Sequence, residues 1–202
     1  MLIDVGSASV LDVYHVLVGV VTPRPIAWVT TVDAAGRVNL APFSFYNAFG
    51  ANPPVVVFSP TLRRDGSRKD TLRNVEATGE FVLNAAIESL ADQVNLSSKE
   101  LPYGVSEVDF TGLHLLPSLK VKPPRIAETP VHLEGKVLQI VAIGKGAIAG
   151  NLVIGEIVVI HVDDTVLDDQ GKVDPRKLRT IARLGGDSYC RTTDLFEMKR
   201  PQ

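Results

Sequence analysis

The sequence predicts one mainly β domain with a few helices, in which antiparallel strands form a barrel or a sandwich. Runs rich in β-branched and aromatic residues outnumber helical patterns along the 202 residues. Several of these runs follow one another directly, whereas a parallel sheet would alternate strands with helices. A chain of this length can bury roughly 70% of its unfolded surface, so its core needs no metal or disulfide.

Six strand-like runs carry this prediction. They span residues 26–32, 38–46, 55–59, 81–87, 131–143 and 152–162. The first two are separated by the turn Asp33–Arg37, which predicts a hairpin. The last two are joined by a glycine-rich turn at 144–151, which predicts a second and longer hairpin.

Three segments predict helices. Residues 70–78 stop at Gly79, a good C-terminal signal, and residues 89–96 place apolar side chains at helical spacing. The third helix should begin at Asp174, which can cap it, and end before Gly185. Its expected buried stripe consists of Leu178, Ile181 and Ala182.

Composition limits the function classes. The net charge of −2 argues against a nucleic-acid-binding surface spread over the protein. The N-terminus lacks a signal-peptide pattern, and no apolar run reaches the roughly 18 to 20 residues of a membrane span. We therefore expect a cytoplasmic protein with neither nucleic-acid nor membrane partners. The proline-rich stretch 101–129 predicts a long excursion over the surface.

Arg24 is a candidate anion-binding residue because Pro23 and Pro25 restrict its backbone towards an extended geometry. A guanidinium on such a stiff segment suits bidentate capture of a phosphate or a carboxylate. The alternative is a solvated loop arginine that precedes a strand. These residues alone favour the alternative.

A second candidate is the basic stretch 63–71, which runs into the predicted helix at 70–78. Four cations and two hydroxyls gather there, where free backbone N–H groups at a helix N-terminus favour an anion. The alternative is that Ser67 or Asp70 caps the helix while the cations are solvated. The two interpretations are compatible.

The segment Asn39–Asn47 alternates hydrogen-bonding and aromatic residues, as contacts with a flat polar ring would require. It also fits an edge strand, with Pro42 marking the edge and the aromatic rings in the core. The segment Gly144–Gly150 differs from the dinucleotide fingerprint by one residue and precedes a strand, so it predicts a hairpin loop.

The remaining reactive side chains form no catalytic or metal-binding pattern. The histidines are His15, His114, His132 and His161, and no two have a metal-ligand spacing. Cys190 is the single cysteine, so no internal disulfide can form. The sequence therefore predicts no metal site, and the catalytic residues stay unassigned.

Five segments in order resemble the flavin reductase-like, FMN-binding split-barrel family. They are TPRPIAWVTTVDAAGRVNLAPFSFYNAF (22–49), NPP (52–54), RKDTLRN (68–74), TGEFVLN (78–84) and RLGGDSY (183–189). The resemblance covers about residues 21–189 of a single domain that spans 1–202. It implies an antiparallel split β-barrel that forms a homodimer, with one FMN near the interface in each chain.

The resemblance also implies roles for individual residues. The FMN phosphate would be held by Arg68, Lys69, Thr71 and Arg24. The isoalloxazine and ribityl groups would be lined by Trp28, Val29, Thr30, Ser44, Phe45 and Asn47. Asn84 would reach the ribityl chain or the ring edge, and Tyr189 would close over the flavin from its own chain or from the partner.

The function implied is an FMN-dependent oxidoreductase that uses NADH or NADPH to reduce flavin or another small acceptor. Such chemistry belongs to the cofactor and demands no acid or base side chain, which agrees with the lack of a catalytic pattern. Two alternatives stay open. One is an FMN redox carrier without a nicotinamide site, and the other is a non-catalytic module that binds flavin or another ligand.

Overall fold

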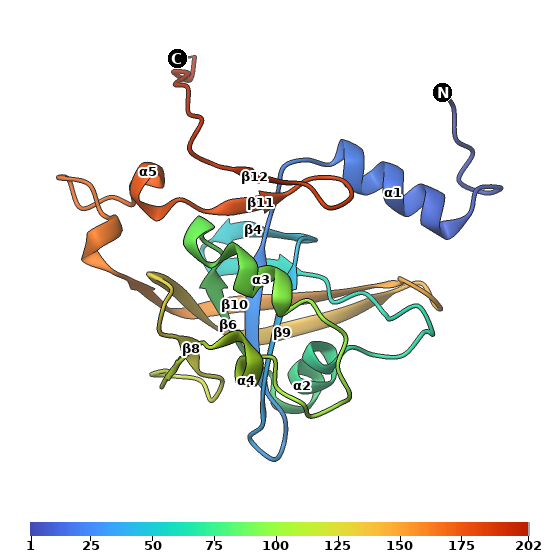
Figure 1. The fold of residues 1–202 in the computed structure, drawn as a ribbon, viewed down its shortest axis with the longest axis horizontal. Coiled ribbons are helices and arrows are strands. Elements are labelled where there is room, and N and C mark those ends of the chain that lie inside the picture. Colours follow the sequence, from blue (N-terminus) through green and yellow to red (C-terminus); the bar gives the residue numbers. More distant parts are fainter. Residues whose placement is uncertain (202) are drawn as a thin grey trace.

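The computed structural model describes residues 1–201, and its main element is a seven-stranded antiparallel sheet (Figure 1). The strands lie in the order β3-β2-β6-β9-β10-β5-β4. Their bounds are β2 Ala27–Val32, β3 Val38–Phe43, β4 Tyr46–Ala51, β5 Pro54–Phe58, β6 Glu80–Ala85, β9 Val131–Ile143 and β10 Gly150–Val162. The mainly β, antiparallel class predicted from the sequence is confirmed.

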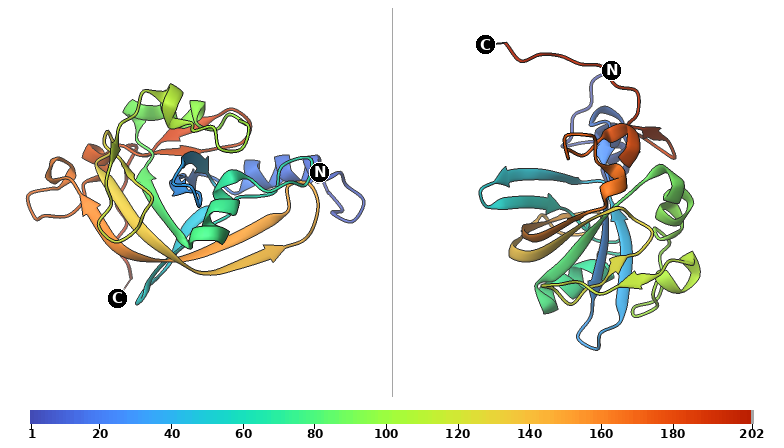
Figure 2. Two further views of the ribbon diagram at one scale, coloured as in Figure 1. Left: turned by 90° about the horizontal axis from the view of Figure 1, so that it is seen from below. Right: turned by 90° about the vertical axis from the view of Figure 1, so that its left-hand side faces the viewer.

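The sheet curls on itself because consecutive strands lie at its two edges. β3 ends at Phe43 on one edge, and β4 begins at Tyr46 on the other. Three residues span at most about 11 Å, so these two edges must approach each other. The long hairpin of β9 and β10 forms the curved wall seen in Figure 2, with register shifts along its length. Pro42 lies on the edge strand β3, as predicted.

Two smaller sheets lie outside the barrel wall. The first joins β1 (Arg24–Pro25), β11 (Ile181–Arg183) and β12 (Tyr189–Arg191). The second pairs β7 (Leu115–Leu116) with β8 (Arg125–Ile126) inside the proline-rich stretch. That stretch otherwise contains only the one-turn helix α4 (Val108–Thr111), in agreement with the expected surface excursion.

The barrel interior is a dry aromatic and aliphatic core. Phe58 and Phe81 pack edge to face, with ring centroids 5.2 Å apart. The ring of Phe81 needs two glycines beside it, since a Cβ added at Gly135 or Gly155 would come within 2.4 Å of that ring. A second core, around Trp28, fills the outer side of β2 beneath η1 (Glu88–Leu90) and α3 (Ala91–Leu96).

The helix α2 (Asp70–Thr78) agrees with the sequence prediction and closes one end of the barrel. It stops where Gly79 adopts a left-handed conformation with φ 69°. Two side-chain hydrogen bonds join it to the sheet. Asn39 donates to the Thr71 hydroxyl over 2.9 Å, and Asn74 donates to the Thr31 hydroxyl over 3.0 Å. The start of α2 is therefore fixed against β3.

Two helices differ from the sequence predictions. The helix expected from Asp174 is a single turn, α5 (Pro175–Leu178), because Arg179 adopts a left-handed conformation with φ 49°. Ile181 and Ala182 are buried, but as part of β11, which pairs with β1 and β12. The N-terminal helix α1 (Val10–Val20) has no counterpart in the sequence analysis. No helix within residues 1–201 combines the length and apolar character that crossing a membrane would require.

Candidate functional site

A cleft of about 120 Å³ lies between the edge strand β3, the N-terminus of α2 and the segment that follows α3. β3 contributes Asn39 and Phe43, and α2 contributes Thr71 beside Lys69. The opposite wall runs from Ser97 to Leu101 and includes Glu107. The cleft therefore joins two segments predicted separately as ligand contacts, 39–47 and 63–71.

The N-terminus of α2 is available to an anion. Lys69 occupies the N-cap position in an extended conformation, and its side chain makes no capping hydrogen bond. The first backbone N–H groups of a helix have no partner within the helix, and they carry the positive end of its dipole. Arg63 lies beside this end, 3.3 Å from the Asp70 carboxylate. This geometry suits a phosphate group.

Lys69 supplies an uncommitted cation to the cleft. Its ammonium nitrogen lies 5.6 Å from the centroid of the Phe43 ring, and it makes no ion pair within residues 1–201. Burial lowers the pKa of Lys69, the nearby Arg63 lowers it further, and Glu100 opposes the change. A bound phosphate would compensate for the loss of hydration of this ammonium group.

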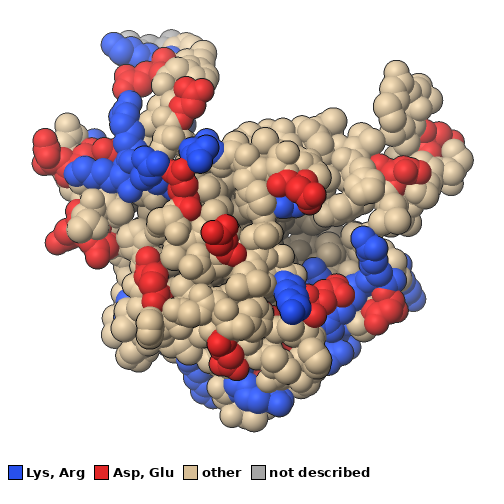
Figure 3. All heavy atoms as spheres, in the orientation of Figure 1, with Lys and Arg blue, Asp and Glu red and all other residues tan. Residues whose placement is uncertain are grey.

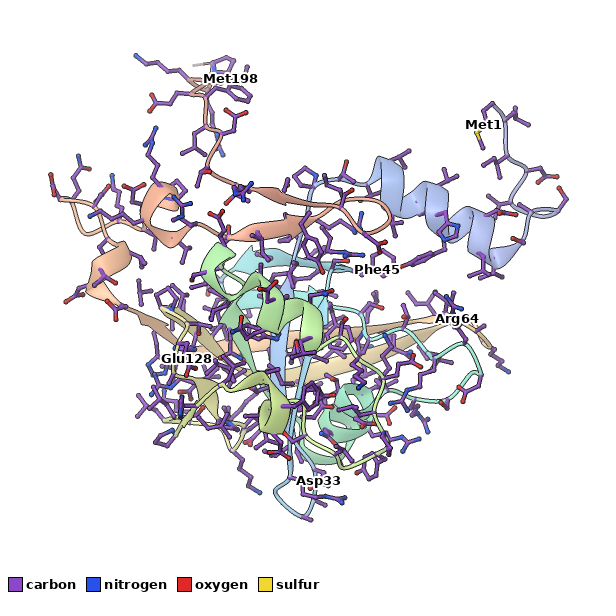
Figure 4. The ribbon with its side chains drawn as sticks, viewed as in Figure 1. Met1, Asp33, Phe45, Arg64, Glu128 and Met198 are labelled. Atoms are coloured by element: carbon purple, nitrogen blue, oxygen red, sulfur yellow. The ribbon has the colours of Figure 1, made fainter. Side chains whose placement is uncertain are left out.

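A second hollow of about 180 Å³ adjoins the cleft beneath α1 and shares Arg63, Lys69 and Glu100 with it. Tyr14 of α1 forms one wall, and its ring meets Phe45 edge-on with centroids 6.4 Å apart. Figure 3 shows this hollow below α1, with basic side chains beside it, and Figure 4 shows Phe45 under the same helix. Together the cleft and the hollow form a groove from α2 to α1.

The structure places Arg24 elsewhere, in a buried hydrogen-bonded hub. Its guanidinium donates to the carbonyls of Val18 and Val21 over 2.5 and 2.7 Å. It also donates to the Leu184 carbonyl over 2.8 Å and to the Ser44 hydroxyl over 3.3 Å. Arg24 thus ties the end of α1 and the β11–β12 hairpin to the corner between β3 and β4.

Arg68 also lies apart from the cleft. Its side chain is 60% exposed and pairs with Glu76 over 3.3 Å. It faces a separate outer groove, beside Arg73 and Lys145. Of the four residues expected at the phosphate, only Lys69 and Thr71 line the cleft together.

Four of the residues expected to contact the ring or ribityl chain are buried, and one of them, Asn84, lines a separate pocket of about 310 Å³ beside Tyr46. Trp28, Val29 and Thr30 are fully buried, and the indole of Trp28 donates to the Ser97 hydroxyl over 2.9 Å. The Asn84 amide donates to the Trp28 carbonyl and accepts from the backbone N–H of Ile126. These side chains stabilise the pairing of β2 with β6 in the barrel wall.

The remaining predicted residues lie nearer the surface, where Asn47 is exposed and Ser44, Phe45 and Tyr189 are half-buried. Ser44 and Phe45 form the crossing between the two sheet edges, and Asn47 is exposed on β4, where its side-chain oxygen accepts from the next backbone N–H. Tyr189 is half-buried on β12 against the outer core. The guanidinium of Arg183 stacks on the Tyr189 ring, 4.5 Å from its centroid. The Tyr189 hydroxyl lies 3.5 Å from the side-chain oxygen of Asn95.

The wall of the cleft opposite β3 and α2, formed by residues 97–101 and Glu107, has no candidate site residue predicted from the sequence. Ser97 and Glu107 form its outer wall, and only 5% of the surface of Glu107 is exposed. Glu107 lies in the proline-rich stretch, which has no periodic pattern. Nothing local to the sequence marks it as a cleft residue.

Comparisons with known proteins identify the family of this chain. Residues 20–181 match the model of the flavin reductase like domain. An uncharacterized protein of Halalkalibacterium halodurans is 41% identical over 100% of this chain and 97% of its own length. The match to the family model covers most of the chain, so the protein belongs to the flavin reductase-like domain family, and its fold is the split barrel expected from the resemblance.

Two solved structures are similar over nearly their full length. Component B of nitrilotriacetate monooxygenase from Bacillus cereus is 32% identical, with a TM-score of 0.92 and coverage of 98% of both chains. The 2-nitrobenzoate 2-nitroreductase of Pseudomonas fluorescens is 32% identical, with a TM-score of 0.88 and coverage of 100% of this chain and 96% of the other. The arrangement of the groove can therefore be interpreted within a family of flavin-binding proteins.

Proposed function

We propose that this protein is an FMN-dependent oxidoreductase that uses NADH or NADPH to reduce flavin or another small acceptor. The single observation that carries the proposal is the unpaired Lys69 beside the uncapped start of α2, in one cleft with Thr71. The names of the two solved relatives, a monooxygenase component and a nitroreductase, support the oxidoreductase class.

The donor set of the cleft fits FMN. Lys69, the Thr71 hydroxyl and the first N–H groups of α2 are suited to hold the phosphate. The cleft is too small for a three-ring system, since pockets for molecules of that size measure about 300 to 1,000 Å³. The ring would therefore extend towards the adjoining hollow and Phe45, where Tyr14 adds a second aromatic face.

When bound, FMN supplies the redox chemistry of such an enzyme, while the protein binds and orients it. In this chain Lys69 would neutralise the phosphate, and α1 would shield one side of the groove from water. Arg24 would act indirectly, by fixing α1 and the Ser44 corner in place. No acid or base side chain is assigned, because hydride transfer does not require one.

A visible absorption spectrum of the purified protein, with FMN added, tests the proposal first. A protein that neither retains nor takes up FMN would exclude both the enzyme and the redox carrier and leave a module for another ligand. If flavin binds, NADH and NADPH are added without oxygen. Prompt bleaching supports the oxidoreductase. A flavin that dithionite reduces and nicotinamides do not would identify a redox carrier.

The same proposal includes a homodimer in the cytoplasm. α1 projects from the barrel in Figure 1, and of its residues only Val18 is buried. Val20 on α1 and Phe49 on β4 are 70% and 67% exposed. Such apolar surface is typical of an interface with another chain. Light scattering should show a dimer at micromolar concentration, and a flavin-loaded monomer would contradict it.

A further inference from the structure

The outer wall of the cleft is a strap, defined here as Ser97–Glu107, that is fixed at several points. At its start, Ser97 accepts a hydrogen bond from the Trp28 indole. In its middle, the Tyr103 ring makes cation–π contacts with two guanidinium groups, that of Arg37 at 5.3 Å and that of Arg73 at 5.0 Å from its centroid. A wall held in this way can present a side chain to a ligand in a defined position.

Glu107, at the end of the strap, is that side chain. Its Oε2 accepts a hydrogen bond of 2.9 Å from the backbone N–H of Leu40 on the edge strand β3. Within residues 1–201 no other residue donates a hydrogen bond to the second oxygen, Oε1, and Glu107 lines the cleft although only 5% of its surface is exposed. An ionised carboxylate only accepts hydrogen bonds, so Oε1 needs a donor.

The surroundings of Glu107 compensate only in part for this burial. Burial raises the pKa of its carboxyl, and the backbone N–H groups of Leu40 and of Glu107 itself partly oppose the change. Of the charged groups nearby, Asp70 on α2 raises the pKa further, and Arg63 from the preceding loop lowers it. A carboxylate in a narrow cleft loses hydration, and a ligand that brings a donor would recover part of that cost.

We propose that Glu107 is a specificity-determining residue, whose Oε1 accepts a hydrogen bond from a hydroxyl of the ligand whose phosphate Lys69 holds. The cleft then selects a phosphorylated polyol such as the ribityl phosphate of FMN. A second negative group is excluded, because it would face the carboxylate. This inference rests on the proposed function, which places FMN in the groove.

Binding of three flavins tests the inference. FMN has both phosphate and ribityl chain, riboflavin lacks the phosphate, and lumiflavin lacks both. Glu107→Ala should weaken FMN and riboflavin alike, by about tenfold, and leave lumiflavin unchanged. Lys69→Ala, the matched control, should weaken FMN alone. Loss of affinity for all three flavins in Glu107→Ala, or for none, would overturn the inference. A wild-type protein that binds no flavin would instead refute the proposed function.

Stability of Glu107→Gln gives a second readout that a purely structural role would not produce. A raised carboxyl pKa in the folded protein means that stability is lost as the pH rises through the ordinary and then the raised value. The amide introduced by this substitution carries no charge and can still accept from Leu40. The ligand-free variant should therefore melt at a higher temperature than wild type at pH 8 and at the same temperature below about pH 4. A variant that melts lower at every pH would show that Glu107 serves only to hold β3.

Discussion

The hub around Arg24 and the cleft around Lys69 both contain a cation that the sequence assigns to phosphate binding, yet their surroundings differ. In the hub, three backbone carbonyls and one hydroxyl accept hydrogen bonds from the Arg24 guanidinium. In the cleft, the Lys69 ammonium has an aromatic ring beside it and no anionic partner within residues 1–201.

The difference shows how to separate a structural cation from a ligand-binding one. The N–H donors of Arg24 already bond to acceptors of its own chain. Arg24 therefore contributes to stability and has few donors available for a phosphate. Lys69 is desolvated and makes no ion pair within residues 1–201, and the nearby Glu100 compensates only in part, so its best partner is an anion that comes from outside. Uncommitted donors and acceptors, rather than charge alone, mark the binding surface.

The largest effect is expected from Arg24→Ala. The substitution removes the donor from the buried carbonyl of Val18 and from the part-buried carbonyls of Val21 and Leu184, and an unsatisfied buried acceptor costs about 1 to 3 kcal/mol. We expect a loss of about 2 to 3 kcal/mol and a fall in Tm of about 4 to 12 °C. Thermal denaturation by circular dichroism measures it. If the variant were stable but lost FMN affinity selectively, Arg24 would belong to the phosphate site.

The pH dependence of FMN binding should report on Lys69. Because burial lowers the pKa of this amine below its ordinary value of 10.5, the charge that attracts the phosphate is lost earlier as the pH rises. As the pH rises towards 10.5, FMN affinity should therefore fall by about tenfold or more, while riboflavin affinity stays constant. Lys69→Arg should remove the dependence. A parallel fall for both flavins would point to a general structural transition.

The smallest effect is expected from Arg68→Ala. Its ion pair with Glu76 is exposed, and such pairs contribute about 0 to 1 kcal/mol. Stability should change by about 0.5 kcal/mol or less, and FMN affinity by less than about twofold. Isothermal titration with FMN checks the second value. A loss as large as that of Lys69→Ala would show that Arg68 turns towards the ligand when it binds.

Local signals explain what could be predicted of the fold. The hairpin at Asp33–Arg37, the stop at Gly79 and the edge position of Pro42 each follow from the conformations that those residues allow. The prediction of the third helix was wrong because its second half pairs with a strand 157 to 159 residues earlier in the chain, Arg24 with Arg183 and Pro25 with Ala182. Ile181 and Ala182 fit a helical stripe equally well, and no local pattern reveals their strand partners.

The candidate site also contains residues that local signals predict and residues that depend on long-range contacts. The basic stretch before α2 was recognised because a helix start can be inferred from sequence. Trp28 and Thr30 were expected at the ligand because they lie in a matching motif, but Trp28 packs in the second core and the Thr30 hydroxyl donates to the Pro124 carbonyl. Glu107 reaches the cleft only through the path of the strap, which depends on contacts such as Tyr103 with Arg37. Long-range geometry of this kind has no signature in a single sequence.

The ratio of FMN to riboflavin affinity in wild type and in Lys69→Ala tests most directly whether Lys69 holds the phosphate. If it does, wild type should prefer FMN, and the variant should lose about 10- to 150-fold of that preference. Its riboflavin affinity and its Tm should stay close to those of wild type. An unchanged ratio, or an equal loss for both flavins, would contradict the assignment of the α2 cleft as the phosphate site.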